Sequence, residues 1–219
     1  VRGAGSGKAL SSNATSAQGA YDATYGFLDT FEATGFVVKT GSSYANYTNK
    51  NNESYVAWNW KAGGTPVTIG VNSITGSTPS IASTVSANPA AGFSIVRNTG
   101  TASYTDTIGH GLSQAPEIVI QKPVAANVAW YVLFNLDGTG GWDYASLNTT
   151  AAFGADNPVR FSANSTTINN WGWNTYDMIN YCFHSVSGYS SIATYQGVTG
   201  NKVISTGFRP SFVIIKNTS

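Results

Sequence analysis

The sequence predicts an all-β protein made of tandem antiparallel β-sandwich units. Three observations support this prediction. Short runs of β-branched and aromatic residues recur about every ten residues, with Gly, Asn, Ser and Pro between them. No segment keeps the helical periodicity of apolar residues over a dozen positions. Finally, parts of the chain repeat one another in order, which indicates more than one unit.

Each predicted strand is a short apolar run between turn residues. Residues 55–60 (YVAWNW) alternate, which places Val56, Trp58 and Trp60 on one face. Residues 128–134 and 211–216 are nearly continuous apolar runs, as expected for strands that are buried on both faces. The remaining predicted strands lie at residues 93–96 (FSIV), 117–122 (EIVIQK), 179–183 (INYCF) and 203–208 (VISTGF).

The repeat is visible as two ordered sets of matching segments. In the C-terminal half, residues 92–100 match residues 188–197, and residues 115–122 match residues 209–216. The N-terminal third matches the middle of the chain in the same way, with residues 12–17, 31–38 and 58–61 on residues 147–152, 161–168 and 181–184. Because the anchors keep their order, we interpret them as copies of one unit.

The repeat defines the predicted domain organisation. Residues 1–62 are the C-terminal part of a preceding unit, and residues 63–90 are a linker rich in Gly, Ser, Thr and Pro. Residues 91–186 form one complete β-sandwich unit, and residues 187–219 are the N-terminal part of a following unit. Neither partial unit contains a counterpart of NVAWYVLFN. We therefore expect a piece of a longer repeat array, or a subunit that its neighbours complete.

Composition excludes several classes of partner. Only 10% of the residues are charged, the formal net charge is +1, and Lys and Arg are scattered. We therefore expect no binding to nucleic acid, and no membrane insertion, since no apolar run approaches the ~20 residues of a membrane span. Cys182 is the single cysteine, which rules out an intramolecular disulfide and a thiolate metal site. We expect it to be a buried, unreactive thiol.

No catalytic constellation is recognisable in the sequence. The two histidines, His110 and His184, lie far apart, and the ten Asp and Glu residues are dispersed. A glycosidase needs two facing carboxylates, and a metal centre needs converging ligands. We therefore predict a protein that is not an enzyme, with no catalytic residues, no metal and no cofactor.

Residues 169–176 (NNWGWNTY) form the most suggestive loop. Aromatic rings stack on sugars and amides bond hydroxyl groups, so Trp171, Trp173, Asn174 and Tyr176 are candidate carbohydrate-binding residues. The more ordinary interpretation is that both Trp side chains cover the sandwich edge or pack on a neighbouring unit. The matching loop of the first copy (SSYANYTNKNN) contains no Trp, so the two loops are not expected to bind alike.

Taken together, the segments YVAWNWKAGG, STVSANPAAGFSIV, IGHGL, APEIVIQK, SLNTTAA, YCFHSVSGYS and TGFRPSFVIIK are specific enough to compare with known proteins. Their succession resembles a repeated module in tail-fibre and virion-surface proteins of marine tailed bacteriophages. The sequence departs from a tight tandem in its long linker. The resemblance implies lectin-like (jelly-roll) sandwich units, a virion-surface or extracellular location, and a homo-oligomer whose partners are its own copies and other virion proteins.

Three functions follow as hypotheses. The first is a non-enzymatic virion structural protein (a tail fibre, spike or capsid-attached decoration) that mediates surface assembly and host attachment. The second is a carbohydrate-binding module or adhesin, with a host-surface glycan as its partner. The third is a self-assembling extracellular filament subunit in which residues 211–216 complete a neighbour's sheet by strand donation.

Overall fold

The computed structural model describes residues 9–19, 24–43, 48–135, 141–155, 161–170 and 175–217. These residues form antiparallel strands and one 3-10 turn, η2 (Pro89–Ala91), which confirms the predicted all-β class. The strands are β1 Phe27–Phe31, β2 Phe36–Lys39, β3 Val67–Ile69, β4 Ser83–Asn88, β5 Phe93–Thr99, β6 Thr107–Gly109, β7 Ile118–Pro123, β8 Tyr131–Phe134, β9 Asp143–Ser146, β10 Gly154–Ala155, β11 Thr167–Asn169 and β12 Asp177–Phe183.

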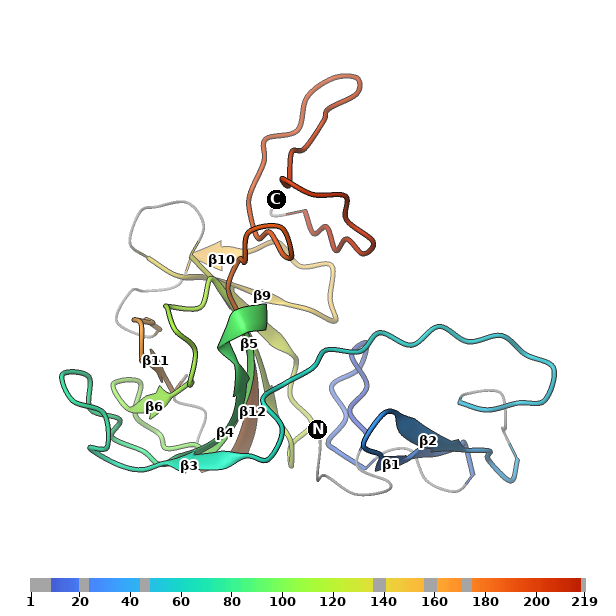
Figure 1. Ribbon diagram of the computed structural model, residues 1–219, viewed down its shortest axis with the longest axis horizontal. Helices are drawn as coiled ribbons and strands as arrows, with labels where there is room; N and C mark the ends of the chain where they lie inside the picture. Colours follow the sequence, from blue (N-terminus) through green and yellow to red (C-terminus); the bar gives the residue numbers. More distant parts are fainter. Residues whose placement is uncertain are drawn as a thin grey trace.

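One large antiparallel sheet organises the molecule. Its eight strands lie in the order β10-β9-β8-β7-β12-β5-β4-β3. The last strand in sequence, β12, is central, because it pairs with β5 along its whole length and with β7 on its other side. Because β12 is the last of these strands in sequence, the strands on its two sides are joined into one sheet only when β12 is added between them (Figure 1).

A second layer, the two-stranded sheet β6–β11, covers one face of the large sheet. The core between the layers draws on both of them, since Ile108 of β6 and Ile168 of β11 are fully buried with Val96 of β5 and Leu133 of β8. This two-layer arrangement is the predicted antiparallel sandwich. The buried apolar residues of the core are Val85, Val96, Ile108, Leu112, Val119, Leu133, Trp142, Phe161, Ile168 and Cys182.

A chain of buried amides crosses the same core. Asn180 of β12 donates to the side-chain oxygen of Asn98 at 3.0 Å, and Asn98 donates to Asn170 at 3.2 Å. Asn170 in turn donates to the Thr101 carbonyl at 3.2 Å. Buried polar groups are tolerated when they satisfy each other in this way.

The structure corrects the prediction that residues 63–90 are a linker. Two strands of the large sheet, β3 and β4, lie in this segment. Val85 reaches the core, and the small hydroxyl residues are satisfied locally, since Ser83 donates to the Gly109 carbonyl at 2.9 Å and Ser86 to the Gly64 carbonyl at 3.0 Å. The low apolar content that resembled a linker therefore belongs partly to β3, the edge strand, and to β4 beside it. The boundaries of the repeat units remain predictions.

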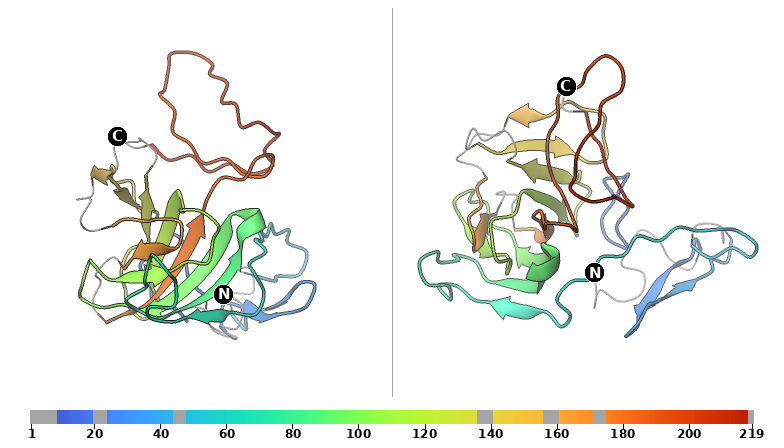
Figure 2. Two further views of the ribbon diagram at one scale, coloured as in Figure 1. Left: turned by 60° about the vertical axis from the view of Figure 1, so that its left-hand side comes forward. Right: turned by 45° about the horizontal axis from the view of Figure 1, so that its top comes forward.

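Three predicted strands are not strands in the structure: residues 55–60, 203–208 and 211–216. The N-terminal third contributes the hairpin β1–β2 beside the sandwich, and residues 187–217 extend away from it (Figures 1 and 2). These three segments have no paired strand, whereas β12 and β7, the counterparts of residues 55–60 and 211–216, are each paired on both sides. Ile108 and Val119 are 0% exposed, whereas their repeat counterparts Ile204 and Val213 are 42% and 61% exposed.

Candidate functional site at the joint between units

Residues 9–18, from the predicted preceding unit, lie against the complete unit at the ends of β7 and β8. The indole nitrogen of Trp130 donates to the Ser11 carbonyl at 2.7 Å. The backbone amide of Gln18 donates to the Val124 carbonyl at 2.7 Å, and that of Ala17 donates to the Asn127 side chain at 2.9 Å. These contacts span more than a hundred residues of sequence, so they define a joint between predicted units.

Lys122 lies at the centre of this joint. Its side chain is 0% exposed, and its ammonium donates to the carbonyls of Thr15 at 3.2 Å, Pro123 at 2.9 Å and Ala126 at 2.9 Å. A lysine head has three donors and no acceptor, so these three carbonyls satisfy it. Burial lowers the pKa of Lys122 from its ordinary value. Among the residues that the structure describes, Lys122 forms no ion pair, so carbonyl oxygens alone are its hydrogen-bond partners.

The strand pattern places Lys122 on the outer face of the large sheet. Along β7, Val119 points into the core, so Ile120 and Lys122 point to the opposite face. Trp130 stacks on Tyr181 of β12, with ring centroids 6.3 Å apart and planes at 24°. Burial raises the pKa of Tyr181 to about 12. The stacked rings of Trp130 and Tyr181 therefore form an apolar surface beside the buried lysine.

A second joint of the same kind lies at the other end of the chain. The Lys216 ammonium donates to the carbonyls of Thr149 at 3.4 Å and Ala151 at 3.5 Å. It also lies over the Phe153 ring, 5.5 Å from the centroid. By the repeat, Lys216 is the counterpart of Lys122, and residues 147–152 are the counterpart of residues 12–17. Equivalent lysines of two successive units thus contact equivalent loops of the units before them.

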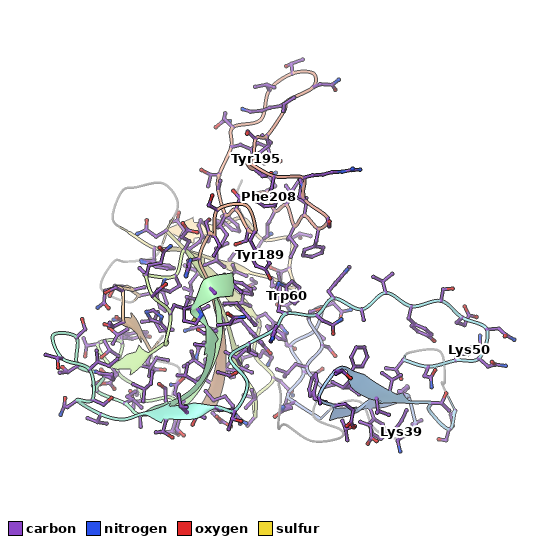
Figure 3. All side chains as sticks on the ribbon, viewed as in Figure 1. Lys39, Lys50, Trp60, Tyr189, Tyr195 and Phe208 are labelled. Carbon is purple, nitrogen blue, oxygen red and sulfur yellow. The ribbon has the colours of Figure 1, made fainter. Side chains whose placement is uncertain are left out.

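The terminal apolar segments contact each other close to this second joint. The Phe212 ring lies 5.1 Å from that of Trp58 and 6.0 Å from that of Trp60, centroid to centroid. Figure 3 places Trp60 near the base of the projecting C-terminal segment. Hydrogen bonds hold residues 55–61 at both ends: the Lys50 amide donates to the Tyr55 hydroxyl at 3.0 Å, and the Asn88 side chain donates to the Lys61 carbonyl at 3.0 Å.

The predicted carbohydrate loop is only partly described. Trp171, Trp173 and Asn174 lie outside the described residues. Tyr176 is half-buried, and its carbonyl accepts a hydrogen bond from the Gly100 amide at 2.6 Å. On the other side of the loop, the Asn169 side chain donates to the Tyr104 carbonyl at 2.8 Å. Both ends are therefore tied to residues 100–104.

The carbohydrate hypothesis stays a prediction, and alanine substitutions test it. If Trp171 and Trp173 form a sugar platform, Trp171→Ala and Trp173→Ala are expected to lower glycan binding by roughly tenfold or more, since stacking on an aromatic face contributes ~1–2 kcal/mol. A glycan array measures binding, and thermal melting measures folding. A large fall in melting temperature without any bound glycan would instead identify both side chains as packing residues.

Other reactive groups are isolated or buried. Cys182 is fully buried, and desolvation raises its pKa to about 12, which confirms the predicted unreactive thiol. Within the described ranges, no three His, Cys, Asp or Glu side chains gather closely enough to hold a metal ion. The part of the chain that the structure describes contains no helix with the length and apolar character to span a bilayer.

Sequence reasoning missed the joint, although a signal for it was present. Both APEIVIQK and RPSFVIIK end in lysine, and these residues are Lys122 and Lys216. A lysine that recurs at the inner end of an apolar strand is unusual, because lysine is rarely buried unless it is paired. The carbonyl that joins each lysine to the preceding unit, however, lies more than sixty residues away: Thr15 for Lys122 and Thr149 for Lys216.

Comparison with known proteins returns one match. A family model described as a domain of unknown function (DUF7483) matches residues 1–219. No curated protein and no solved structure matches the chain.

Proposed function

The chain belongs to the DUF7483 family, a family of domains of unknown function, and we propose that it is a non-enzymatic structural module of a phage virion. In this proposal its sandwich units stack head to tail in a tail fibre, spike or capsid-attached decoration. The virion location is supported by the resemblance of its strand and turn sequences to repeated modules of phage surface proteins.

The observation that carries the structural role is the joint that occurs twice. The Lys122 ammonium donates to the Thr15 carbonyl in the loop that precedes its unit. The Lys216 ammonium donates to carbonyls of the matching loop one unit later. A contact that recurs at equivalent positions of a repeat is the mark of a quasi-one-dimensional array, in which each unit touches its neighbours. Stability of the array then depends on these joints as well as on the core of each unit.

The joint can be opened selectively by Lys122→Met, which retains much of the aliphatic stem but removes the ammonium. Hydrogen bonds from a charged group contribute ~1.5–3 kcal/mol net. We expect local opening of residues 9–18, with amide exchange at Ala17 and Gln18 faster by roughly 10- to 100-fold. Hydrogen exchange read by mass spectrometry measures this change.

Lys216→Met is the matched control for this variant, because Lys216 is only half-buried and its carbonyl contacts are longer. It should leave exchange at Ala17 and Gln18 unchanged. If Lys122→Met leaves these amides equally protected, the lysine clamp does not hold the joint, and the proposal loses its main support.

The location on a virion has its own test. Antibodies raised against the full chain are expected to label the surface of purified particles of the phage that encodes it, in immunogold electron microscopy. Label confined to tails or to capsids would distinguish a fibre from a decoration protein. Particles that remain unlabelled, although their proteins react with the same antibody after denaturation, would place the chain away from the surface.

A further inference from the structure

Two segments, residues 55–60 and residues 189–215, expose an unusual amount of apolar surface. Val56 is 82% exposed, and most of the large apolar side chains of residues 189–215 lie open to solvent as well. Figure 3 shows Tyr189 and Tyr195 on the projecting part of the chain. Large exposed apolar surface usually marks a binding site where its side chains gather. The exposed apolar residues in question are Val56, Trp58, Trp60, Tyr189, Tyr195, Val198, Val203, Ile204, Phe212, Val213, Ile214 and Ile215.

The repeat assigns a place in a sheet to each segment. Residues 58–61 match the end of β12, residues 188–197 match β5 with its flanking glycines, and residues 211–216 match β7. In the complete unit, β12 lies between β5 and β7. The repeat therefore assigns residues 55–61 the place of a central strand, and residues 188–197 and 211–216 the places of its two neighbours.

The complete unit also predicts the register of this pairing. In the β12–β7 ladder, Phe183 lies opposite Ile118. Trp60 is the counterpart of Phe183 in the repeat. Phe212 is the counterpart of Ile118. The register of the complete unit thus places Trp60 opposite Phe212, and Trp58 on the same face two residues along.

The ring contacts agree with this register independently. Phe212 touches Trp60, its predicted opposite residue, and Trp58, the diagonal neighbour on the same face. Side chains two residues apart on a strand share a face, so one aromatic ring reaches both. The two segments are therefore complementary in sequence order and in surface.

Within a single chain this complementarity is used only at one position. Residues 55–60 and 211–216 contain no strand, and Val213, Ile214 and Ile215 are each more than 60% exposed although Phe212 touches both Trp rings. Eight of the exposed side chains lie in residues 55–61, 188–194 and 211–216; at on the order of 100 Å² each they amount to roughly 800 Å², the size of the smaller protein interfaces. Main-chain hydrogen bonds between paired strands add to such an apolar contact.

We propose that this partner is a second copy of the chain. Residues 55–61 of one copy leave their own Phe212 and enter the next copy as the central strand between residues 188–194 and residues 211–216. The inference rests on the proposed structural function and names its partner. It is continuous with the lysine joint, since Lys216 already docks on residues 149–151 at the end of the accepting strand. The contact is head to tail, so it propagates into rings or filaments.

Disulfide trapping between two single-cysteine variants tests the proposal. Cys182 of β12 lies opposite Val119 of β7, and the repeat transfers this pair to Asn59 and Val213. Full-length chains carrying Asn59→Cys are mixed with chains of distinguishable mass carrying Val213→Cys, and are then oxidised. We expect the mixture to form at least tenfold more cross-linked heterodimer than either variant alone forms cross-linked homodimer.

Two features make this result specific. A second matched mixture, Trp58→Cys with Ile214→Cys, covers the adjacent pair, because opposite residues alternate between wide and close spacing in an antiparallel ladder. The mismatched mixture, Asn59→Cys with Ile214→Cys, places the thiols on opposite faces and should not cross-link. Native Cys182 is fully buried and adds no background.

The outcomes separate this inference from the proposed function. Heterodimer from the matched mixtures alone supports pairing between copies. A double variant, Asn59→Cys with Val213→Cys, that closes within a monomer while the mixtures give no heterodimer would show pairing inside one chain and overturn the proposal, as would the absence of any cross-link. Sedimentation velocity on the unoxidised samples reads assembly itself: oligomers without register-specific cross-links would reject this interface but leave a structural function standing.

Discussion

Phe161→Ala is expected to destabilise the complete unit by about 3–5 kcal/mol, the usual loss when a buried Phe is truncated. Phe161 is 0% exposed in the core and meets Trp142 edge to face, with centroids 4.8 Å apart. Truncation leaves a cavity between the two layers, because the rigid sheets cannot collapse into it. Urea unfolding measures the change, and the melting temperature should fall by roughly 10 °C.

Phe31→Ala is the control that the repeat itself provides. Phe31 is the counterpart of Phe161 in the first copy, yet it is 42% exposed at the end of β1. Its truncation should therefore change the unfolding free energy by less than ~1 kcal/mol. Equal losses at the two positions would mean that the N-terminal part is as well packed as the complete unit, contrary to the structure.

Acidification from pH 7 to pH 4 is expected to weaken the fold through His110 by up to about 3 kcal/mol. Burial lowers the pKa of His110 from 6.5 to about 4, and the nearby His184 contributes to the shift. The Leu112 amide donates to Nδ1 of His110 at 3.1 Å, so the neutral ring carries its proton on Nε2, which lies 3.1 Å from the Asn164 carbonyl. Protonation at Nδ1 would oppose the Leu112 amide.

The sign follows from proton binding. Between pH 6.5 and 4 the unfolded chain binds a proton at His110 that the folded chain does not. The free energy of unfolding therefore decreases as the pH is lowered through this window, and it levels off below about pH 4. Unfolding in urea at a series of pH values measures the slope. The variant His110→Gln should have a flatter slope than the wild type, whatever its stability at pH 7. Identical slopes would show that another group titrates.

The sequence predicted the β class and four strands of the complete unit, because these depend on local patterns; it did not predict β6, β9, β10 and β11. The strands predicted at residues 93–96, 117–122, 128–134 and 179–183 correspond to β5, β7, β8 and β12. It failed at β4, where Ser and Thr gave the appearance of a linker. The hydroxyl groups of Ser83 and Ser86 are satisfied by backbone carbonyls, and those acceptors cannot be recognised without the fold.

The candidate site divides in the same way. The recurrence of lysine at the end of two related strands is visible in the sequence, but its burial is not. Lys122 is enclosed because residues 9–18 return to the sheet and bring the Thr15 carbonyl within 3.2 Å. The sequence showed the composition of the predicted carbohydrate loop but not how its ends are held. The Gly100 amide holds one end and the Tyr104 carbonyl holds the other.

By itself, the sequence determined the all-β class and predicted a repeat of β units, because periodicity, turn residues and ordered anchors can be read along the chain without the fold. Only the tertiary structure decided which copy of each repeated strand is buried. Residues 117–122 lie in or next to β7, which has β12 on one side and β8 on the other, whereas residues 211–216, which are similar in sequence, have no paired strand and are mostly exposed. A strand is stabilised by the strands beside it, and these come from distant parts of the chain or from another copy of it.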